Sequence, residues 1–328
     1  MDSDASAPAG LAVPARTIPP PQSISPQAQA FLARGMPILP PQISHTDKDG
    51  WRAYLAESEK MLQAYVGERM KTMPARVEEQ RLSSCALYEA TPETAAPQDD
   101  DKVIFSVHGG GFTSGGGRIA VFSALELATV ARLKAFAVDY RMPPDHPFPT
   151  PLDDTLEAYR FLLERYDPKK IAVEGSSAGA NLAAAVILKA RDEGLPLPGA
   201  CVLHTAAVDL TQSGDSFATN TVIDVVLRGP DVERMLLYAD GHDMRDPYLS
   251  PVFGDFAKGF PPTILLTGTR DLLLSPTVMM HRALRRAGVE AELHVFEAMP
   301  HGSFGHDTPE DHERVAESAR FVRAHLGG

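Results

Sequence analysis

The chain has 328 residues, of which 44% are hydrophobic and 23% charged, as is usual for soluble globular proteins. Its 31 basic and 43 acidic residues give a formal net charge of −12, which argues against nucleic acids and anionic membranes as partners. Two cysteines, Cys85 and Cys201, are too few for a disulfide framework or a cysteine-rich zinc site. Residues 1–30 contain no basic segment followed by an apolar run, and no stretch is apolar enough to span a bilayer. We therefore expect a cytoplasmic protein.

The first elements predicted are helical. After a proline-rich segment, residues 27–34 favour a short helix that starts near Ser25 and Pro26. Residues 45–70 favour a longer amphipathic helix, because apolar side chains from Trp51 to Tyr65 recur near helical spacing. Residues 76–89 alternate weakly and predict edge strands.

From residue 101 onward, short apolar runs alternate with helical patterns. Such alternation predicts an α/β fold with a mostly parallel, doubly wound sheet, whose ligands lie at the carboxyl ends of the strands. Residues 211–246 interrupt the alternation with one helix near 230–238 and predict an insertion over the sheet. The predicted strands are 103–107, 135–138, 171–174, 200–203, 263–267 and 292–296, and the predicted helices are 119–133, 152–166, 178–192, 275–287 and 310–326.

A candidate nucleophile follows the strand 171–174. The sequence there, from Gly175 to Gly179, reads Gly-Ser-Ser-Ala-Gly and leads into a helix. A G-x-S-x-G match is a weak signal by itself, but a strand–turn–helix context is where such a turn exposes its serine above a sheet. We therefore expect Ser177 to be the nucleophile.

A glycine-rich loop follows the strand 103–107. His108-Gly109-Gly110-Gly111-Phe112 lets the backbone approach a ligand closely and direct N–H groups at it. The tetrahedral oxyanion of acyl transfer needs such donors. A phosphate-binding loop is the alternative, but no Lys-Ser or Lys-Thr pair follows. The second run, 115–117, is interpreted as loop.

A serine nucleophile needs a base, and the base needs an orienting acid. Asp271 follows the strand 263–267 and His301 follows the strand 292–296, so the chain order is Ser177, Asp271, His301. This order is typical of α/β-hydrolases. The chain has 11 histidines; His306 is the main competitor for the base, and His294, within a strand, is interpreted as structural.

Four motifs together resemble the bacterial hormone-sensitive-lipase-like esterases. They are His108 to Phe112, the segment Asp139 to Pro149, Gly175 to Asn181, and Pro300-His301-Gly302. The resemblance implies an α/β-hydrolase fold with a helical cap and divides the chain into an N-terminal segment with cap helices (1–75), a core (76–210), a cap insertion (211–246) and further core (247–328). It also implies that His301 is the base, that Asp271 orients it, and that the backbone N–H groups of Gly110, Gly111 and Ala178 form the oxyanion hole.

Three positions depart from the family pattern. Ser176 stands where the family usually has Asp or Thr, Met142-Pro143 replaces Leu-Ala, and Ser275 stands where a second acid is common. None of these changes removes a group that the chemistry needs, so they bear on substrate preference.

The expected function is a carboxylesterase for short- to medium-chain neutral esters, with no metal or cofactor. Lactone or amide hydrolysis by the same residues is one alternative, a non-catalytic binding protein on the same fold is another, and a proline-rich interaction segment at 37–40 is a third. The resemblance suggests a homodimer through the last strand or helix. The side chains expected to line the substrate pocket are Phe31, Met36, Phe112, Phe217 and Leu227.

Overall fold

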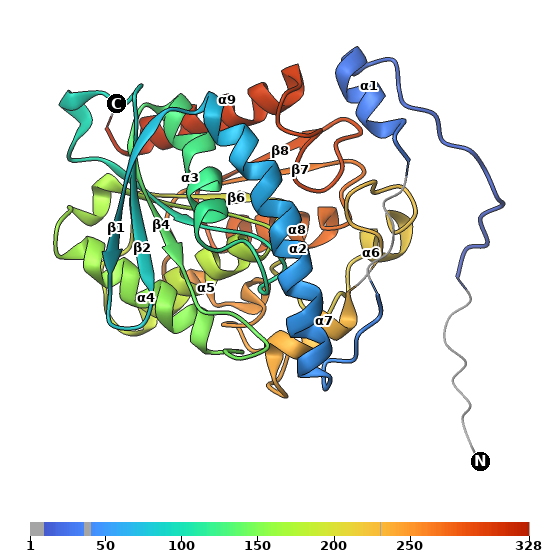
Figure 1. Ribbon diagram of the computed structural model, residues 1–328, viewed down its shortest axis with the longest axis horizontal. Helices are drawn as coiled ribbons and strands as arrows, with labels where there is room; N and C mark the ends of the chain where they lie inside the picture. Colours follow the sequence, from blue (N-terminus) through green and yellow to red (C-terminus); the bar gives the residue numbers. More distant parts are fainter. Residues whose placement is uncertain (1–9, 36–40, 230, 328) are drawn as a thin grey trace.

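A computed structural model describes residues 10–35, 41–229 and 231–327. At its centre lies an eight-stranded sheet in the order β1-β2-β4-β3-β5-β6-β7-β8 (Figure 1). All pairings from β4 to β8 are parallel, whereas β1–β2 and β2–β4 are antiparallel. The predicted doubly wound, mostly parallel sheet is therefore confirmed. The strands are β1 (Ala75–Arg81), β2 (Ala86–Pro92), β3 (Val103–Val107), β4 (Lys134–Asp139), β5 (Ile171–Ser176), β6 (Ala200–His204), β7 (Thr263–Gly268) and β8 (Ala291–Phe296).

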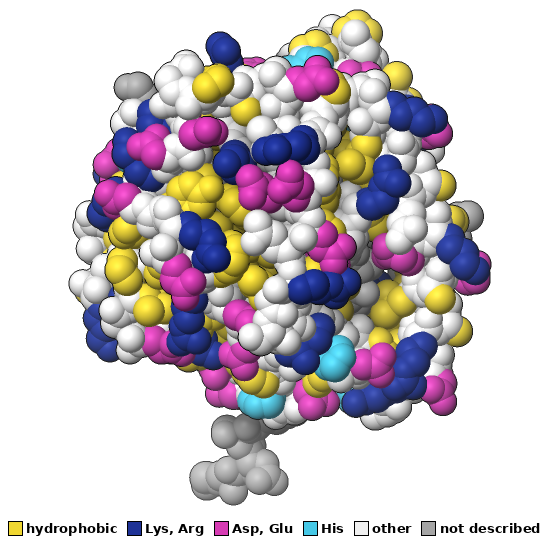
Figure 2. Space-filling model, turned by 60° about the vertical axis from the view of Figure 1, so that its left-hand side comes forward, with side chains coloured by type: hydrophobic (Ala, Val, Ile, Leu, Met, Phe, Trp, Pro, Cys, Tyr) yellow, Lys and Arg dark blue, Asp and Glu magenta, His cyan; other side chains and the backbone are white. Residues whose placement is uncertain are grey.

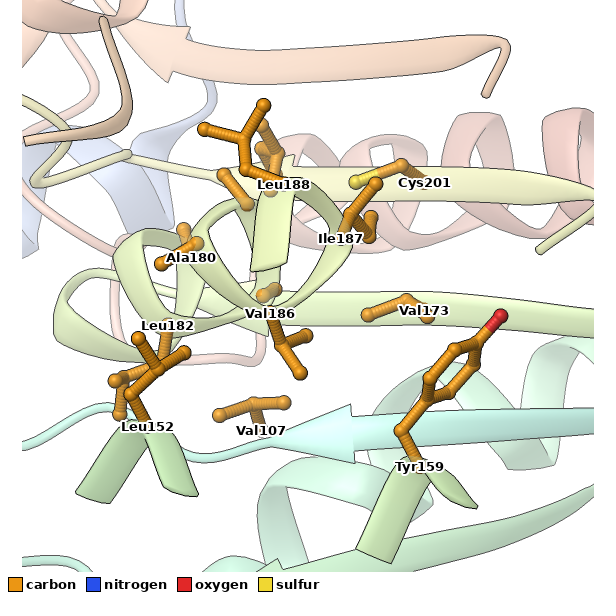
Figure 3. Packing of buried hydrophobic residues seen from close by; sticks show 14 of the residues in the cluster. Val107, Leu152, Tyr159, Val173, Ala180, Leu182, Val186, Ile187, Leu188 and Cys201 are labelled. Carbon is orange, nitrogen blue, oxygen red and sulfur yellow. The ribbon is translucent and has the colours of Figure 1, made fainter. Parts of the chain in front are cut away.

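Helices cover both faces of the sheet because its central strands are apolar on both sides. In β5, Val173 packs on one face with α4 (Thr150–Leu163), α5 (Ala178–Asp192) and α8 (Leu274–Arg286). Its neighbour Ala172 packs on the other face with α3 (Arg118–Ala131) and α9 (Pro309–His325). Figure 3 shows the first cluster, in which Leu152 and Tyr159 of α4 and several α5 residues meet strand side chains such as Val107 and Cys201.

The boundaries of the helices follow their capping residues. Helix α1 (Pro26–Leu32) begins after Ser25, whose hydroxyl accepts from the N–H of Ala28, and has proline at its first position. Helix α9 begins with a capping box between Thr308 and Asp311. Both helices lie within two residues of the predicted bounds at each end.

The edge of the sheet differs from the prediction in one respect. Residues 76–89 were expected to form edge strands, but β1 is the edge and β2 lies between β1 and β4. The alternating pattern of β2 is weak because both of its faces are partly covered, and Leu87 and Ala90 are fully buried. Both cysteines are buried and free.

Helices α1, α2 (Lys48–Arg69), α6 (Ser216–Thr219) and α7 (Val232–Ala239) lie beside the sheet (Figure 1). The first two come from the N-terminal segment and the last two from the region 211–246. Helix α7 was predicted, whereas the four-residue α6 was not, because one turn is too short to show a periodic pattern. All four contribute residues to one cavity at the carboxyl ends of the strands.

Candidate active site

The turn between β5 and α5 places Ser177 in backbone geometry that few side chains tolerate. Ser177 has φ 57° and ψ −119°. A Cβ at Gly175 would lie 2.3 Å from the carbonyl oxygen of Gly179, and one at Gly179 would lie 2.0 Å from that of Val107. The two glycines of the motif are therefore required by the tightness of the turn, and this turn exposes the Ser177 hydroxyl above the sheet.

The three residues expected to act together are in contact. His301 Nε2 lies 3.0 Å from Ser177 Oγ, and His301 Nδ1 lies 3.0 Å from Asp271 Oδ1. Asp271 is fully buried, and its other oxygen accepts from the hydroxyl of Thr267 at 2.7 Å. These contacts let His301 take the serine proton while Asp271 holds the ring in one orientation.

Electrostatics around His301 favour its protonated form. Burial by itself lowers the pKa of His301, but the charge of Asp271, the hydrogen bond to it and the charge of Asp224 together raise that pKa above its usual value. A base with a raised pKa accepts the serine proton more readily, provided the pH keeps it neutral before the reaction.

The other two candidate histidines have different partners. His306 Nδ1 lies 2.6 Å from Glu126 Oε1, and no hydrogen bond joins it to Ser177 within the described chain. His294 lies on β8, where its Nε2 is 3.3 Å from Glu292 Oε2. The geometry therefore places His301, and neither of these two, beside the nucleophile.

The glycine-rich loop after β3 packs directly on the nucleophile turn. A Cβ at Gly109 would lie 2.7 Å from the carbonyl oxygen of Ser176 and 3.4 Å from Ser177 Cβ. Gly110 and Gly111 have φ of 112° and 61°, a backbone conformation that favours glycine. Among the described residues, no protein acceptor takes the N–H groups of Gly110, Gly111 or Ala178. All three residues line the cavity that contains Ser177.

The rest of this loop has a structural explanation. The His108 ring stacks on Tyr140 at 4.1 Å, and burial lowers the pKa of His108 to about 4, so this histidine is neutral. A Cβ at Gly115 would lie 2.5 Å from the carbonyl oxygen of Gly109. The second glycine run is therefore a loop that packs closely behind the first.

A cavity of about 1580 Å³ extends from Ser177 between the strand ends and the helices α1, α2, α6 and α7. It is larger than the usual site for a drug-sized ligand. Phe31, Phe217 and Leu227 line it. Phe112 also borders it, but its fully buried ring stacks on Tyr238 at 3.9 Å. Met36 lies outside the described residues, as does the segment 37–40.

Sequence reasoning missed several buried polar residues near the triad. Glu174 precedes the nucleophile motif, accepts a hydrogen bond from the Ser106 hydroxyl, and has a pKa that burial raises to about 7. Asn220 and Asp224, in the region 211–246, contact the loops that carry Asp271 and His301. A charged residue within the apolar strand 171–174 is a visible signal for Glu174. Asp224, within the apolar run Ile223 to Leu227, gives a weaker one.

Other kinds of site were also sought within the described residues. No group of three or more His, Cys, Asp or Glu side chains there could hold a metal ion. None of the helices described is long and apolar enough to cross a bilayer. On the face shown in Figure 2, basic and acidic side chains are interspersed.

Comparisons with known proteins agree with this fold. Residues 104–305 match the model of a family with the alpha/beta hydrolase fold. An acetyl-hydrolase from Streptomyces hygroscopicus is 31% identical over 72% of this chain and 81% of its own. The solved structure of an esterase superposes with a TM-score of 0.89 at 35% identity and covers 97% of this chain and 99% of its own. Another, from the bacterial hormone-sensitive lipase family, gives a TM-score of 0.79 at 29% identity and covers 92% of this chain and 99% of its own.

The chain belongs to the hormone-sensitive-lipase-like esterases of the α/β-hydrolase fold. A carboxylesterase from Mycobacterium tuberculosis, 32% identical over 62% of this chain and 67% of its own, is a further relative. This esterase is therefore a serine carboxylic ester hydrolase that acts on small-molecule esters.

Proposed function

We propose that this esterase hydrolyses its substrates by two-step acyl transfer at Ser177. The observation that carries the proposal is the continuous hydrogen-bonded series from Ser177 through His301 to Asp271. Ser177 attacks the ester carbonyl while His301 Nε2 takes its proton. His301 then protonates the leaving alcohol, and water releases the acyl group by the same route. Asp271 stays ionised and stabilises the imidazolium.

The backbone N–H groups of Gly110, Gly111 and Ala178 are the proposed oxyanion hole. All three residues line the same cavity as Ser177, and their N–H groups have no acceptor in the described protein, so they are free to bind the developing charge. One such donor contributes roughly 3 to 4 kcal/mol to the stabilisation of a transition state. Ala178 also opens helix α5, whose N-terminal partial charge favours an anion.

The proposed substrates are neutral esters with short to medium acyl chains. Helices α1, α2, α6 and α7 form the proposed cap, supplied by residues 1–75 and 211–246 over a core formed by residues 76–210 and 247–328. Phe31, Phe217 and Leu227 give the cavity apolar walls, which suit hydrocarbon chains, and Phe112 supports one wall from behind. A homodimer through β8 or α9 and a cytoplasmic location remain predictions. Sedimentation velocity tests the first.

The decisive experiment replaces the nucleophile. Ser177→Ala is expected to lower kcat for a p-nitrophenyl ester on the order of 10⁴-fold or more, as in other triad knockouts. A panel of p-nitrophenyl esters of increasing chain length, with one lactone and one amide, then tests the substrate class. If Ser177→Ala retains most of its activity, the proposal is wrong. If the enzyme turns over the lactone or the amide faster than the esters, that compound class, and not simple esters, is its preferred substrate.

A further inference from the structure

One turn of the region 211–246 contacts both loops that carry the acid and the base. Asn220 Nδ2 donates to the carbonyl oxygens of Asp271 at 2.8 Å and Thr269 at 3.2 Å. Four residues later, Asp224 Oδ2 accepts from the N–H of Leu272 at 2.8 Å. Both oxygens of Asp224 lie 3.3 Å from the backbone nitrogen of His301. Asp224 therefore joins the loop after β7 to the loop after β8.

Backbone groups hold the Asp224 carboxylate. Besides the two loop contacts, Asp224 Oδ1 accepts from the N–H groups of Val226 at 2.8 Å and Leu227 at 3.0 Å. The side chain is fully buried, and no Lys or Arg within the described residues forms an ion pair with it. Burying a carboxylate without a cation is costly, so its hydrogen bonds must be well placed for the fold to keep it.

The charge of Asp224 acts on His301. Burial raises the pKa of Asp224, while the charge of His301 lowers it and that of Asp271 raises it. The charged groups that act on His301 are Asp271, from the loop after β7, and Asp224, from the turn at 220–227. The imidazolium forms only as Ser177 attacks, so a second carboxylate nearby stabilises the transition state more than the resting enzyme.

We propose that Asp224 is a positioning residue that fixes the loops of Asp271 and His301 to each other and places a second negative charge near the imidazole. The inference rests on the proposed roles of Ser177, His301 and Asp271. Asn220 is the uncharged partner in this arrangement: it holds the same acid loop through two carbonyl groups but places no charge near His301. Variants of these two residues therefore distinguish the effect of loop position from the effect of the added charge.

The test compares three variants of the full chain. Asp224→Asn keeps the size of the side chain, removes its charge and replaces one accepting oxygen with an NH2 group, which cannot accept from a backbone N–H. Asn220→Ala removes the uncharged contact. Asp154→Asn is the matched control. Asp154 is also fully buried and also accepts from a backbone N–H, that of Arg141, at 2.9 Å. Unlike Asp224, it is paired with the Arg141 guanidinium, and it does not contact the triad. For each variant, kcat and KM are measured across pH, together with the rate at which a fluorophosphonate labels Ser177.

Asp224→Asn is expected to lower kcat and the labelling rate by roughly 10- to 100-fold with little change in KM, because small displacements of reacting groups are that costly. In this variant the fall in kcat on the acid side of the pH profile (the acid limb) is expected to move to lower pH, since His301 loses a neighbouring negative charge. Asn220→Ala is expected to lower kcat with the acid limb in place. Asp154→Asn is expected to keep the kcat of the unaltered enzyme at temperatures below its Tm.

Three results would overturn the inference. One is an unchanged kcat and pH profile in Asp224→Asn. Another is a loss of kcat without a shift of the acid limb. The third is an equal loss in Asp154→Asn. If Asp224→Asn does not fold, Asp224→Ser, which can still accept an N–H, replaces it. An active Ser177→Ala would refute the triad itself, whereas an inactive Ser177→Ala with a normal Asp224→Asn would refute only the role of Asp224.

Discussion

The two halves of the active site are held in place by different kinds of contact. The nucleophile half, formed by the loops after β3 and β5, consists of backbone packed on backbone, with Gly109 against the turn that carries Ser177. The acid–base half, formed by the loops after β7 and β8, is held mainly by polar side chains that bind the backbone of these loops. Thr267 and Asn220 donate to Asp271, at its carboxylate and its carbonyl oxygen, and the backbone N–H of His301 donates to Asp224.

The position of each half in the sheet explains the difference. β3 and β5 are neighbours at the centre of the sheet, so their loops are fixed by strands on both sides. β8 is the edge strand opposite β1, so it has a neighbouring strand on one side only. Polar contacts from residues 216–224 supply the support that a further strand would give. Substitutions in the nucleophile half should therefore lower activity through steric clash. Substitutions in the acid–base half should lower it through the loss of single hydrogen bonds.

The largest expected effect concerns the base. His301→Ala removes the group that takes the serine proton and should lower kcat on the order of 10⁴-fold, measured with a p-nitrophenyl ester. His306→Ala is the control, because His306 lies beside Glu126 and has no hydrogen bond to Ser177. A large loss in His306→Ala with a small one in His301→Ala would move the base to His306.

The next largest effect should come from the nucleophile half. Gly109→Ala places a Cβ 2.7 Å from the carbonyl oxygen of Ser176, and because the obstacle is backbone, the loop must shift. A shifted loop misplaces the oxyanion donors, and the loss of one such donor costs about 10²- to 10³-fold in kcat. Gly10→Ala, at an exposed site with no positive φ and no atom near the added Cβ, controls for general effects of the substitution. Equal kcat in the two variants would contradict the close packing described for Gly109.

The contrast also explains what the sequence could predict. The nucleophile half is carried by contiguous residues, and glycine patterns such as Gly175-Ser176-Ser177 are visible because only glycine fits there. Asp271 and His301 were found because each follows a predicted strand. Asn220 and Asp224, which hold the acid–base half, lie about 50 to 80 residues along the chain from the residues that they contact. No local sequence pattern therefore indicates their role. Helix α6, with its single turn, was missed for a similar reason.

Ser275, which departs from the family pattern, also supports the acid–base half. Ser275 stands where the family often has a second acid. It forms a reciprocal pair with Ser216: each backbone N–H donates to the other's hydroxyl oxygen at 2.9 Å. The Ser216 hydroxyl also donates to the carbonyl oxygen of Leu272 at 2.7 Å. A serine at 275 thus ties α6 to the acid loop without adding charge. Sequence alone showed the substitution but not its partner.

A smaller effect is expected from Ser216→Ala. The change leaves the N–H of Ser275 and the carbonyl group of Leu272 without this partner, which should lower the free energy of unfolding by about 1 to 3 kcal/mol. Urea unfolding measures this loss, and kcat should fall much less than in His301→Ala, because the other contacts to the acid loop remain. Thr219→Ala, on the exposed side of α6, is the control. A Ser216→Ala enzyme as stable as Thr219→Ala would show that α6 does not support the acid loop.

The smallest expected change is a displacement of the acid limb of activity. Neutral His301 is the active form, and its pKa is raised: burial lowers it, but Asp271 and then Asp224 more than compensate. As the pH falls, His301 therefore takes up its proton earlier than a free imidazole, whose pKa is about 6.5. The midpoint of the acid limb of kcat/KM should lie above that value, measured at constant ionic strength with a substrate that does not ionise. Because the two carboxylates that raise this pKa belong to the acid–base half, Gly109→Ala should lower activity at every pH and leave the midpoint in place. A midpoint below 6.5 in the unaltered enzyme would mean that burial outweighs both carboxylates.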